Sequence, residues 1–175
     1  MNNDLLILGG NSKNNISWLN RITKIFNKNY NVNAIYYEHW NNDSEINFDI
    51  ELSKLEKLHD EIKEYFIVAK SIGSIISLMG IEKKIIKPKK VVIMGFPIGL
   101  IKKTNFNIEP LIESSVKRAE ILVIQQKYDP IGSYEEVVKF LPSNIKVVEI
   151  PGHYHVYNNM NVIKPIIDSF LKEDL

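Results

Sequence analysis

The sequence contains no cysteine among its 175 residues and no large excess of charge of one sign. Without cysteine, a disulfide scaffold, a cysteine zinc site and a thiol nucleophile are excluded. Lysine and arginine (22) nearly balance aspartate and glutamate (21), whereas a dedicated binder of nucleic acid or of anionic membranes carries a concentrated basic excess. The composition therefore argues against nucleic acid and against a membrane surface as the partner.

Long hydrophobic runs are also missing, and those present are far too short to span a bilayer. The first residues carry no basic segment, and the apolar run that follows stops at Leu8 before two glycines. This pattern is typical of a first β-strand and not of a signal peptide, so we expect a cytoplasmic location. An apolar fraction of 45% is enough to form a core, and the length predicts one domain over residues 1–175.

Short β-branched runs alternate with longer helical periods along the chain. The strand candidates are residues 5–8, 32–37, 65–69, 91–94, 121–125 and 147–150. Helices are predicted near residues 15–27, 55–62, 72–79, 134–140 and 162–171, with Pro165 in or near the first turn of the last one. Residues 38–48 and 96–107 look irregular. This order predicts an α/β fold: a three-layer domain with a mostly parallel six-stranded sheet.

The candidate functional residues follow the strands, because crossover connections bring the carboxyl ends of parallel strands to one edge. The first strand ends in Gly9-Gly10-Asn11-Ser12, where glycines permit a tight turn and close approach of a ligand. For this segment taken alone, a plain βα turn is the simpler interpretation. The segment lacks the G-x-G-x-x-G pattern of a dinucleotide site and the Lys-Ser or Lys-Thr pair of a phosphate loop.

The third strand leads directly through Ser71 into a helix, with the small residues Ala69 and Gly73 two positions before and after it. This spacing fits a nucleophile elbow, in which a strained serine presents its oxygen above the sheet and bulky neighbours would clash. The alternative is a serine N-cap followed by a glycine that allows close helix packing.

Two further loops carry an acid and a base. Asp129 follows the fifth strand and precedes a proline, where it could simply stabilise a turn. His153 and His155 follow the sixth strand as an H-x-H pair, which can indicate a metal site. A metal site needs further ligands, however, and the only other histidines are His39 and His59, so we expect no metal.

In chain order, Ser71, Asp129 and His155 each lie just past a strand. With the segments Ala69-Lys70-Ser71-Ile72-Gly73-Ser74, Gln126-Lys127-Tyr128-Asp129 and Pro151-Gly152-His153-Tyr154-His155, the chain resembles a small α/β-hydrolase of the serine hydrolase type over nearly its whole length. Relative to that family, Ala69 replaces a glycine, the first turn lacks the common His-Gly pair, and the chain begins at the family's third strand.

The resemblance implies the sheet order 2-1-3-4-5-6 and hydrolysis of a small acyl substrate, a carboxylester or thioester, by a monomer or small homo-oligomer without a cofactor. Ser71 would be the nucleophile, His155 the base and Asp129 its orienting acid. The amide of Ile72, with one from the Gly10–Asn11 turn, would form the oxyanion hole. We favour His155 over His153 because the chain needs residues after the proline-glycine turn to return over the sheet.

Several other segments allow two interpretations. Lys70 would be solvated at the strand top or would favour an anionic substrate through its charge. The apolar segment 96–106, where no large cap domain fits, would line an acyl pocket or pack into the core. His39 and Trp40 would contact substrate or, more simply, anchor their loop. The basic run 83–90 lies away from the proposed site and reads as a solvated face.

Two other classes of protein compete with a hydrolase. The first is a catalytically inactive binding protein on the same fold, because a fold can be kept after its chemistry is lost. The second is a flavodoxin-like or receiver-type domain. A receiver places an acidic cluster after its first strand and an aspartate after the third, where this chain has Gly9-Gly10 and Ser71.

Overall fold

The computed structural model describes residues 3–42, 44–62, 64–104 and 106–172. Six strands form one sheet in the order β2-β1-β3-β4-β5-β6, and every neighbouring pair is parallel. Both the α/β fold class and the strand order predicted above are thereby confirmed. The strands are β1 (Asp4–Leu8), β2 (Asn31–Ile35), β3 (Tyr65–Lys70), β4 (Lys90–Met94), β5 (Glu120–Gln126) and β6 (Lys146–Ile150).

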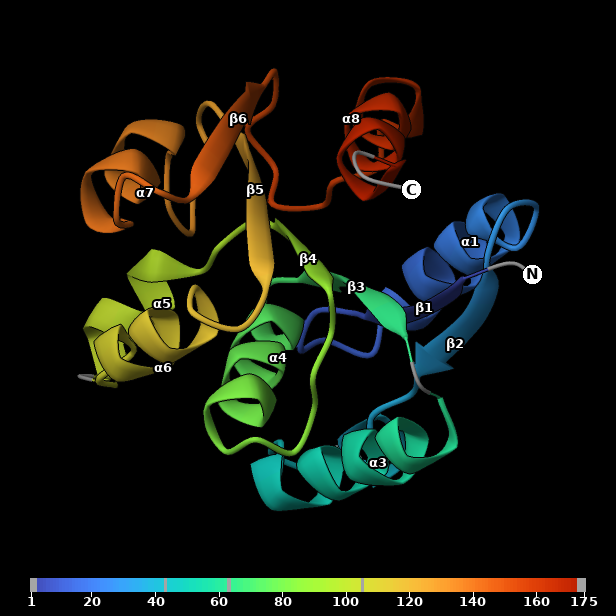
Figure 1. The fold of residues 1–175 in the computed structure, drawn as a ribbon. Helices are drawn as coiled ribbons and strands as arrows, with labels where there is room; N and C mark the ends of the chain where they lie inside the picture. The colour runs from blue at the N-terminus through green and yellow to red at the C-terminus, as the bar shows by residue number, and fades with distance from the viewer. Residues whose placement is uncertain (1–2, 43, 63, 105, 173–175) are drawn as a thin grey trace.

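Helices cover both faces of this sheet (Figure 1). On one face lie α1 (Asn15–Phe26) and α8 (Met160–Lys172); on the other lie α3 (Phe48–Glu61), α4 (Ile72–Glu82) and α6 (Glu109–Ser115). The remaining helices are α2 (His39–Asn42), α5 (Ile98–Thr104) and α7 (Tyr134–Phe140). Among the described residues, no helix is both long and apolar enough to cross a bilayer.

The central strands are buried along their whole length, as expected for strands covered on both faces. Every residue of β3 and of β4 is buried, and the helix α4 that follows β3 is apolar on nearly all sides. In contrast, β2 and β6 at the two edges of the sheet bury only their last residues. The core is therefore densest around β3, the strand that leads into Ser71.

Two local predictions were wrong. The segments expected to be irregular contain the short helices α2 and α5. Pro165 lies inside α8, near its first turn as expected, although the helix begins at Met160, earlier than the apolar stripe indicated. A capping box begins α7: the hydroxyl of Ser133 accepts from the backbone amide of Glu136, whose carboxylate accepts from the backbone amide of Ser133.

Candidate active site

Ser71 stands at the turn between β3 and α4 in a conformation that is unusual for a residue with a side chain. Its φ is 54° and its ψ −118°. The amide of Ser71 donates to the carbonyl of Met94 (3.0 Å), and its own carbonyl accepts from the amide and the hydroxyl of Ser74 (2.9 and 2.6 Å). Such strained backbone persists only where surrounding contacts hold it, and it is concentrated at functional sites.

Close packing explains the small residue after the serine. A Cβ added to Gly73 would lie 2.8 Å from both the carbonyl oxygen of Gly9 and the Cβ of Leu8. The start of α4 therefore rests directly against the end of β1 and the glycine turn. Ile72 is the first residue of α4. The first amides of a helix have no acceptor within the helix, so the backbone amide of Ile72 can donate to a ligand.

Three aromatic side chains hold the glycine turn in place. The Tyr37 hydroxyl donates to the carbonyl of Gly9 (2.9 Å). The carbonyl of Asn11 accepts from the Trp40 indole (2.8 Å) and lies 2.7 Å from Nε2 of His39. His39 and Trp40 are both buried, which agrees with the anchoring interpretation and not with contact to substrate. These contacts fix the peptides Gly9–Gly10 and Asn11–Ser12, which flank the peptide between Gly10 and Asn11 on both sides.

Asp129 and His155 are in direct contact. Nδ1 of His155 lies 2.9 and 2.8 Å from the two carboxylate oxygens of Asp129. The Asp129 side chain is fully buried, whereas that of His155 is 19% exposed. Oδ1 also accepts from the amide of Ile131 (2.9 Å). The other histidine of the pair, His153, is exposed, and its ring contacts that of Tyr154 in a tilted arrangement.

Sequence reasoning missed Tyr157, which completes the surroundings of Asp129. Its buried hydroxyl donates to Oδ2 of Asp129 (2.7 Å) and accepts from the backbone amide of Gln126 (2.9 Å). Burial, and secondarily the charge of Asp129, raise the pKa of Tyr157 well above its ordinary value, so it stays a neutral donor. A tyrosine at this position gives no recognisable signal in the sequence.

Ser71 and His155 line the same pocket, of about 620 Å³, together with Gly10, Asn11, Asn15, Trp18, Arg21 and Lys70. The buried Nε2 of His155 has no hydrogen-bond partner among the described residues. The nitrogen opposite the Asp129 contact is thus available to take a proton. Ile72 is not among the residues lining the pocket, although it follows Ser71 directly.

Lys70 is buried, so the interpretation of a solvated lysine was wrong. Only 6% of the residue is exposed, its Nζ donates to Oδ1 of Asn15 (2.9 Å), and it lies 5.2 Å from the ring centre of Trp18. Burial lowers its pKa to about 8, while the charge of Asp129 opposes that shift. Lys70 therefore places a positive charge in the pocket that contains Ser71.

The apolar segment after β4 does not line this pocket. Phe96, Ile98 and Ile101 are buried in the core, and Leu100 and Phe106 are partly exposed on the surface. None of the five lies among the residues that form the pocket of Ser71. The core-packing interpretation holds for the first three, and the acyl-pocket interpretation is not supported for any of them.

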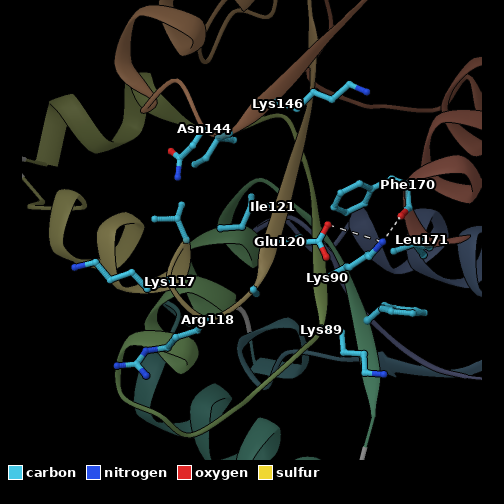
Figure 2. A pocket seen from close by; sticks show the side chains of 14 residues that line it. Lys89, Lys90, Lys117, Arg118, Glu120, Ile121, Asn144, Lys146, Phe170 and Leu171 are labelled. Atoms are coloured by element: carbon cyan, nitrogen blue, oxygen red, sulfur yellow. Dashed lines mark hydrogen bonds and ion pairs between the residues drawn. The ribbon is translucent and has the colours of Figure 1, made fainter. Parts of the chain in front are cut away.

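A larger depression, of about 760 Å³, lies at the amino ends of β4, β5 and β6, whereas Ser71 follows the carboxyl end of β3 (Figure 2). Its cations do not converge: Figure 2 shows Lys146 extending away from Lys117 and Arg118. The buried Lys90 donates to the carbonyl of Phe170 (3.0 Å) and lies 3.9 Å from Glu120. We find no nucleophile and base in contact among the described residues of this depression.

The described residues contain no group of three or more His, Asp and Glu side chains arranged to hold a metal ion. What the site holds instead is a strained serine, an oriented imidazole with one free nitrogen, and a buried carboxylate. This arrangement can carry out nucleophilic attack with proton transfer.

No family model and no curated protein matches this sequence. Solved structures do match. A carboxylesterase of the thaumarchaeon Nitrososphaera gargenis is 13% identical, with a TM-score of 0.69 and coverage of 97% of this chain and 90% of that one. An α/β-hydrolase from a sediment metagenome of the Mar Chica lagoon is 14% identical, with a TM-score of 0.72 and coverage of 99% and 92%.

A third match is the naproxen esterase of Bacillus subtilis, at 15% identity, a TM-score of 0.69 and coverage of 98% of this chain and 84% of that one. At such identities the likeness concerns the fold and carries no residue-by-residue assignment. The topology and these matches together confirm the resemblance noted in the sequence: this chain has the α/β-hydrolase fold.

Proposed function

We propose that this protein is a serine hydrolase that cleaves small carboxylic esters or thioesters through an acyl-enzyme. The observation that carries the proposal is the convergence of strained Ser71 and the Asp129–His155 pair on one pocket. The solved structures of esterases with the same fold support it. Ser71, His155 and Asp129 then act as nucleophile, general base and orienting acid.

In the first step the oxygen of Ser71 attacks the substrate carbonyl while Nε2 of His155 takes the serine proton. The negative charge that develops on the carbonyl oxygen is met by the amide of Ile72 and by an amide of the Gly10–Asn11 turn. Collapse of this intermediate expels the alcohol or thiol, which receives the proton from His155. Water then attacks the acyl-enzyme by the same route, releasing the acid and restoring Ser71.

Asp129 holds His155 in one orientation and one tautomer. Its contact with Nδ1 leaves Nε2 directed to other partners, and the positive charge that forms on the ring is stabilised by the buried carboxylate. The absence of a hydrogen bond between Nε2 and a described residue is compatible with this role, because catalytic contacts often tighten only when substrate is bound.

Intact-mass analysis with a fluorophosphonate tests the proposal. We expect one adduct on the protein and none on Ser71→Ala. Ser74→Ala is a poor comparison because its hydroxyl supports the Ser71 turn. Ser17→Ala, which changes another serine of the same pocket, serves as the matched control and should still react. A folded protein that forms no adduct contradicts the proposal and favours an inactive binding protein on this fold.

A further inference from the structure

The pocket beside Ser71 is polar and positively charged. Its lining includes two cations, Lys70 and Arg21, and no described acidic residue. Several asparagine and serine side chains complete the wall along the start of α1. A pocket for a plain alkyl chain would be lined mainly by apolar side chains, and the apolar segment after β4 is instead packed elsewhere.

Lys70 is a buried cation that contacts no described carboxylate, although the more distant charge of Asp129 acts on it. Among the described residues, none of the carboxylates lies within 4.0 Å of its Nζ, and its hydrogen-bond partner is the neutral side chain of Asn15. One hydrogen bond leaves donors of the ammonium group available. Removing a charge from water is costly when it is not paired, so a ligand that supplies a negative charge here would recover part of that cost.

Arg21 adds a second positive charge at the rim. It is exposed on α1, one turn after Trp18, and its guanidinium donates to Oδ1 of Asn158, which also lines the pocket. Its charge acts on Lys70, on which it has a pKa-lowering effect. The first turn of α1 contains no acidic residue that would offset these cations.

We propose that this pocket selects esters that carry a carboxylate, which Lys70 and Arg21 bind while Ser71 attacks the ester carbonyl. The inference rests on the function proposed above and narrows its substrate class. The buried ammonium of Lys70 supplies the charge at depth, and the planar guanidinium of Arg21 offers two parallel donors to the carboxylate. Proximity to Ser71 follows from the sequence, because Lys70 is its neighbour.

Two pairs of esters that differ in one charge test the proposal. Mono-4-nitrophenyl glutarate against 4-nitrophenyl pentanoate places the carboxylate on the acyl side. The pair 4-acetoxybenzoate and its methyl ester places it on the alcohol side. Each kcat/KM is divided by the rate of hydroxide hydrolysis of the same ester. We expect a preference of about tenfold or more for the anionic member of one pair, the size of a charged hydrogen bond.

Three variants assign that preference to its residues. Lys70→Met should lower it about tenfold, and Arg21→Gln, at an exposed position, about threefold. Lys24→Gln removes the same charge from an exposed position on the same helix, outside the pocket, and should leave the preference intact. Arg21→Gln is the decisive variant, because a substitution at the exposed Arg21 leaves the core untouched.

Calorimetric titration with glutarate tests the pocket without turnover, and binding should weaken in Arg21→Gln but not in Lys24→Gln. Glutarate binding that depends on Arg21 in a protein without hydrolase activity contradicts the proposed function alone. Equal normalised turnover within both ester pairs, in a protein that fluorophosphonate labels at Ser71, overturns the carboxylate inference alone. Absence of both hydrolysis and glutarate binding overturns both.

Discussion

Replacing Tyr157 by phenylalanine removes one hydroxyl from the most buried part of the site. That hydroxyl lies 2.7 Å from Oδ2 of Asp129 and 2.9 Å from the amide of Gln126, and the residue is fully buried. Without it a buried amide loses its acceptor and a buried carboxylate loses one of its donors. We expect a loss of about 2–4 kcal/mol in the free energy of unfolding, since each unmet buried group costs about 1–3 kcal/mol.

For a chain of this size, such a loss lowers Tm by roughly 5–15 °C. Activity should fall as well, because among the described residues the Asp129 carboxylate then keeps only the amide of Ile131 and His155 as partners. We expect kcat to fall about tenfold at a temperature where the variant is folded, with KM little changed, since a small misplacement of a catalytic group acts on the transition state.

The assays are thermal unfolding followed by circular dichroism and kcat and KM on 4-nitrophenyl pentanoate. Tyr128→Phe is the matched control, because it removes the hydroxyl of a tyrosine that is 66% exposed and should change neither value. An unchanged Tm for Tyr157→Phe would refute the hydrogen bonding described for this hydroxyl. A lowered Tm with unchanged kcat would show that the Tyr157 hydroxyl stabilises the fold but does not position Asp129 for catalysis.

Three further changes have defined outcomes. Gly73→Ala should cost about 1–3 kcal/mol of stability and slow fluorophosphonate labelling, because its Cβ would meet Gly9 and Leu8 at 2.8 Å; unchanged Tm and labelling would contradict this packing. Trp40→Phe removes one of two contacts to the carbonyl of Asn11, so kcat should fall about threefold with KM unchanged. A change in KM as large as the change in kcat would exclude a role of Trp40 in the oxyanion hole. Burial lowers the pKa of Lys70 from 10.5 to about 8, so the unfolded chain binds more protons between these values and stability should rise with pH across that window. Denaturant unfolding at pH 7, 8, 9 and 10 should show that rise, up to about 3 kcal/mol, in the wild type and not in Lys70→Met.

The sheet could be predicted from the sequence because its strands leave an unambiguous pattern. β3, with the sequence YFIVAK, is buried at every position, so its composition follows from its surroundings on both faces. Its last residue is the exception that misled the prediction. A lysine at a strand end is ordinarily solvated, and only the contacts with Asn15 and Trp18, far away in the sequence, explain why Lys70 is buried.

The wall of the pocket could not be predicted in the same way. The apolar segment after β4 gave a strong but misleading signal, because Phe96 and Ile98 complete the core and leave no side chain for the pocket. Much of the pocket wall comes instead from α1. Its residues Trp18 and Arg21 are three positions apart and therefore neighbours on the helix surface. Such spacing is common on any helix, and it becomes informative only beside Ser71.

Strained backbone in the site is held by contacts that are distant in the sequence. Among described residues other than glycine, positive φ occurs at Ser71 (54°), His155 (31°), Tyr157 (49°) and one position outside the site, Lys84 (61°). Gln126 holds the histidine loop by two hydrogen bonds. Its side-chain oxygen accepts from the backbone amide of Tyr154 (3.0 Å), and its backbone amide donates to the hydroxyl of Tyr157.

These contacts oppose the local preference of His155 and Tyr157 for negative φ, at a cost of order 1–3 kcal/mol for each strained residue. Local sequence therefore predicts an ordinary loop, and tertiary contacts override it at the place where the imidazole must face the pocket. Removing the Gln126 side-chain amide, as in Gln126→Leu, should for the same reason affect the position of His155 although the two side chains have no hydrogen bond between them among the described contacts.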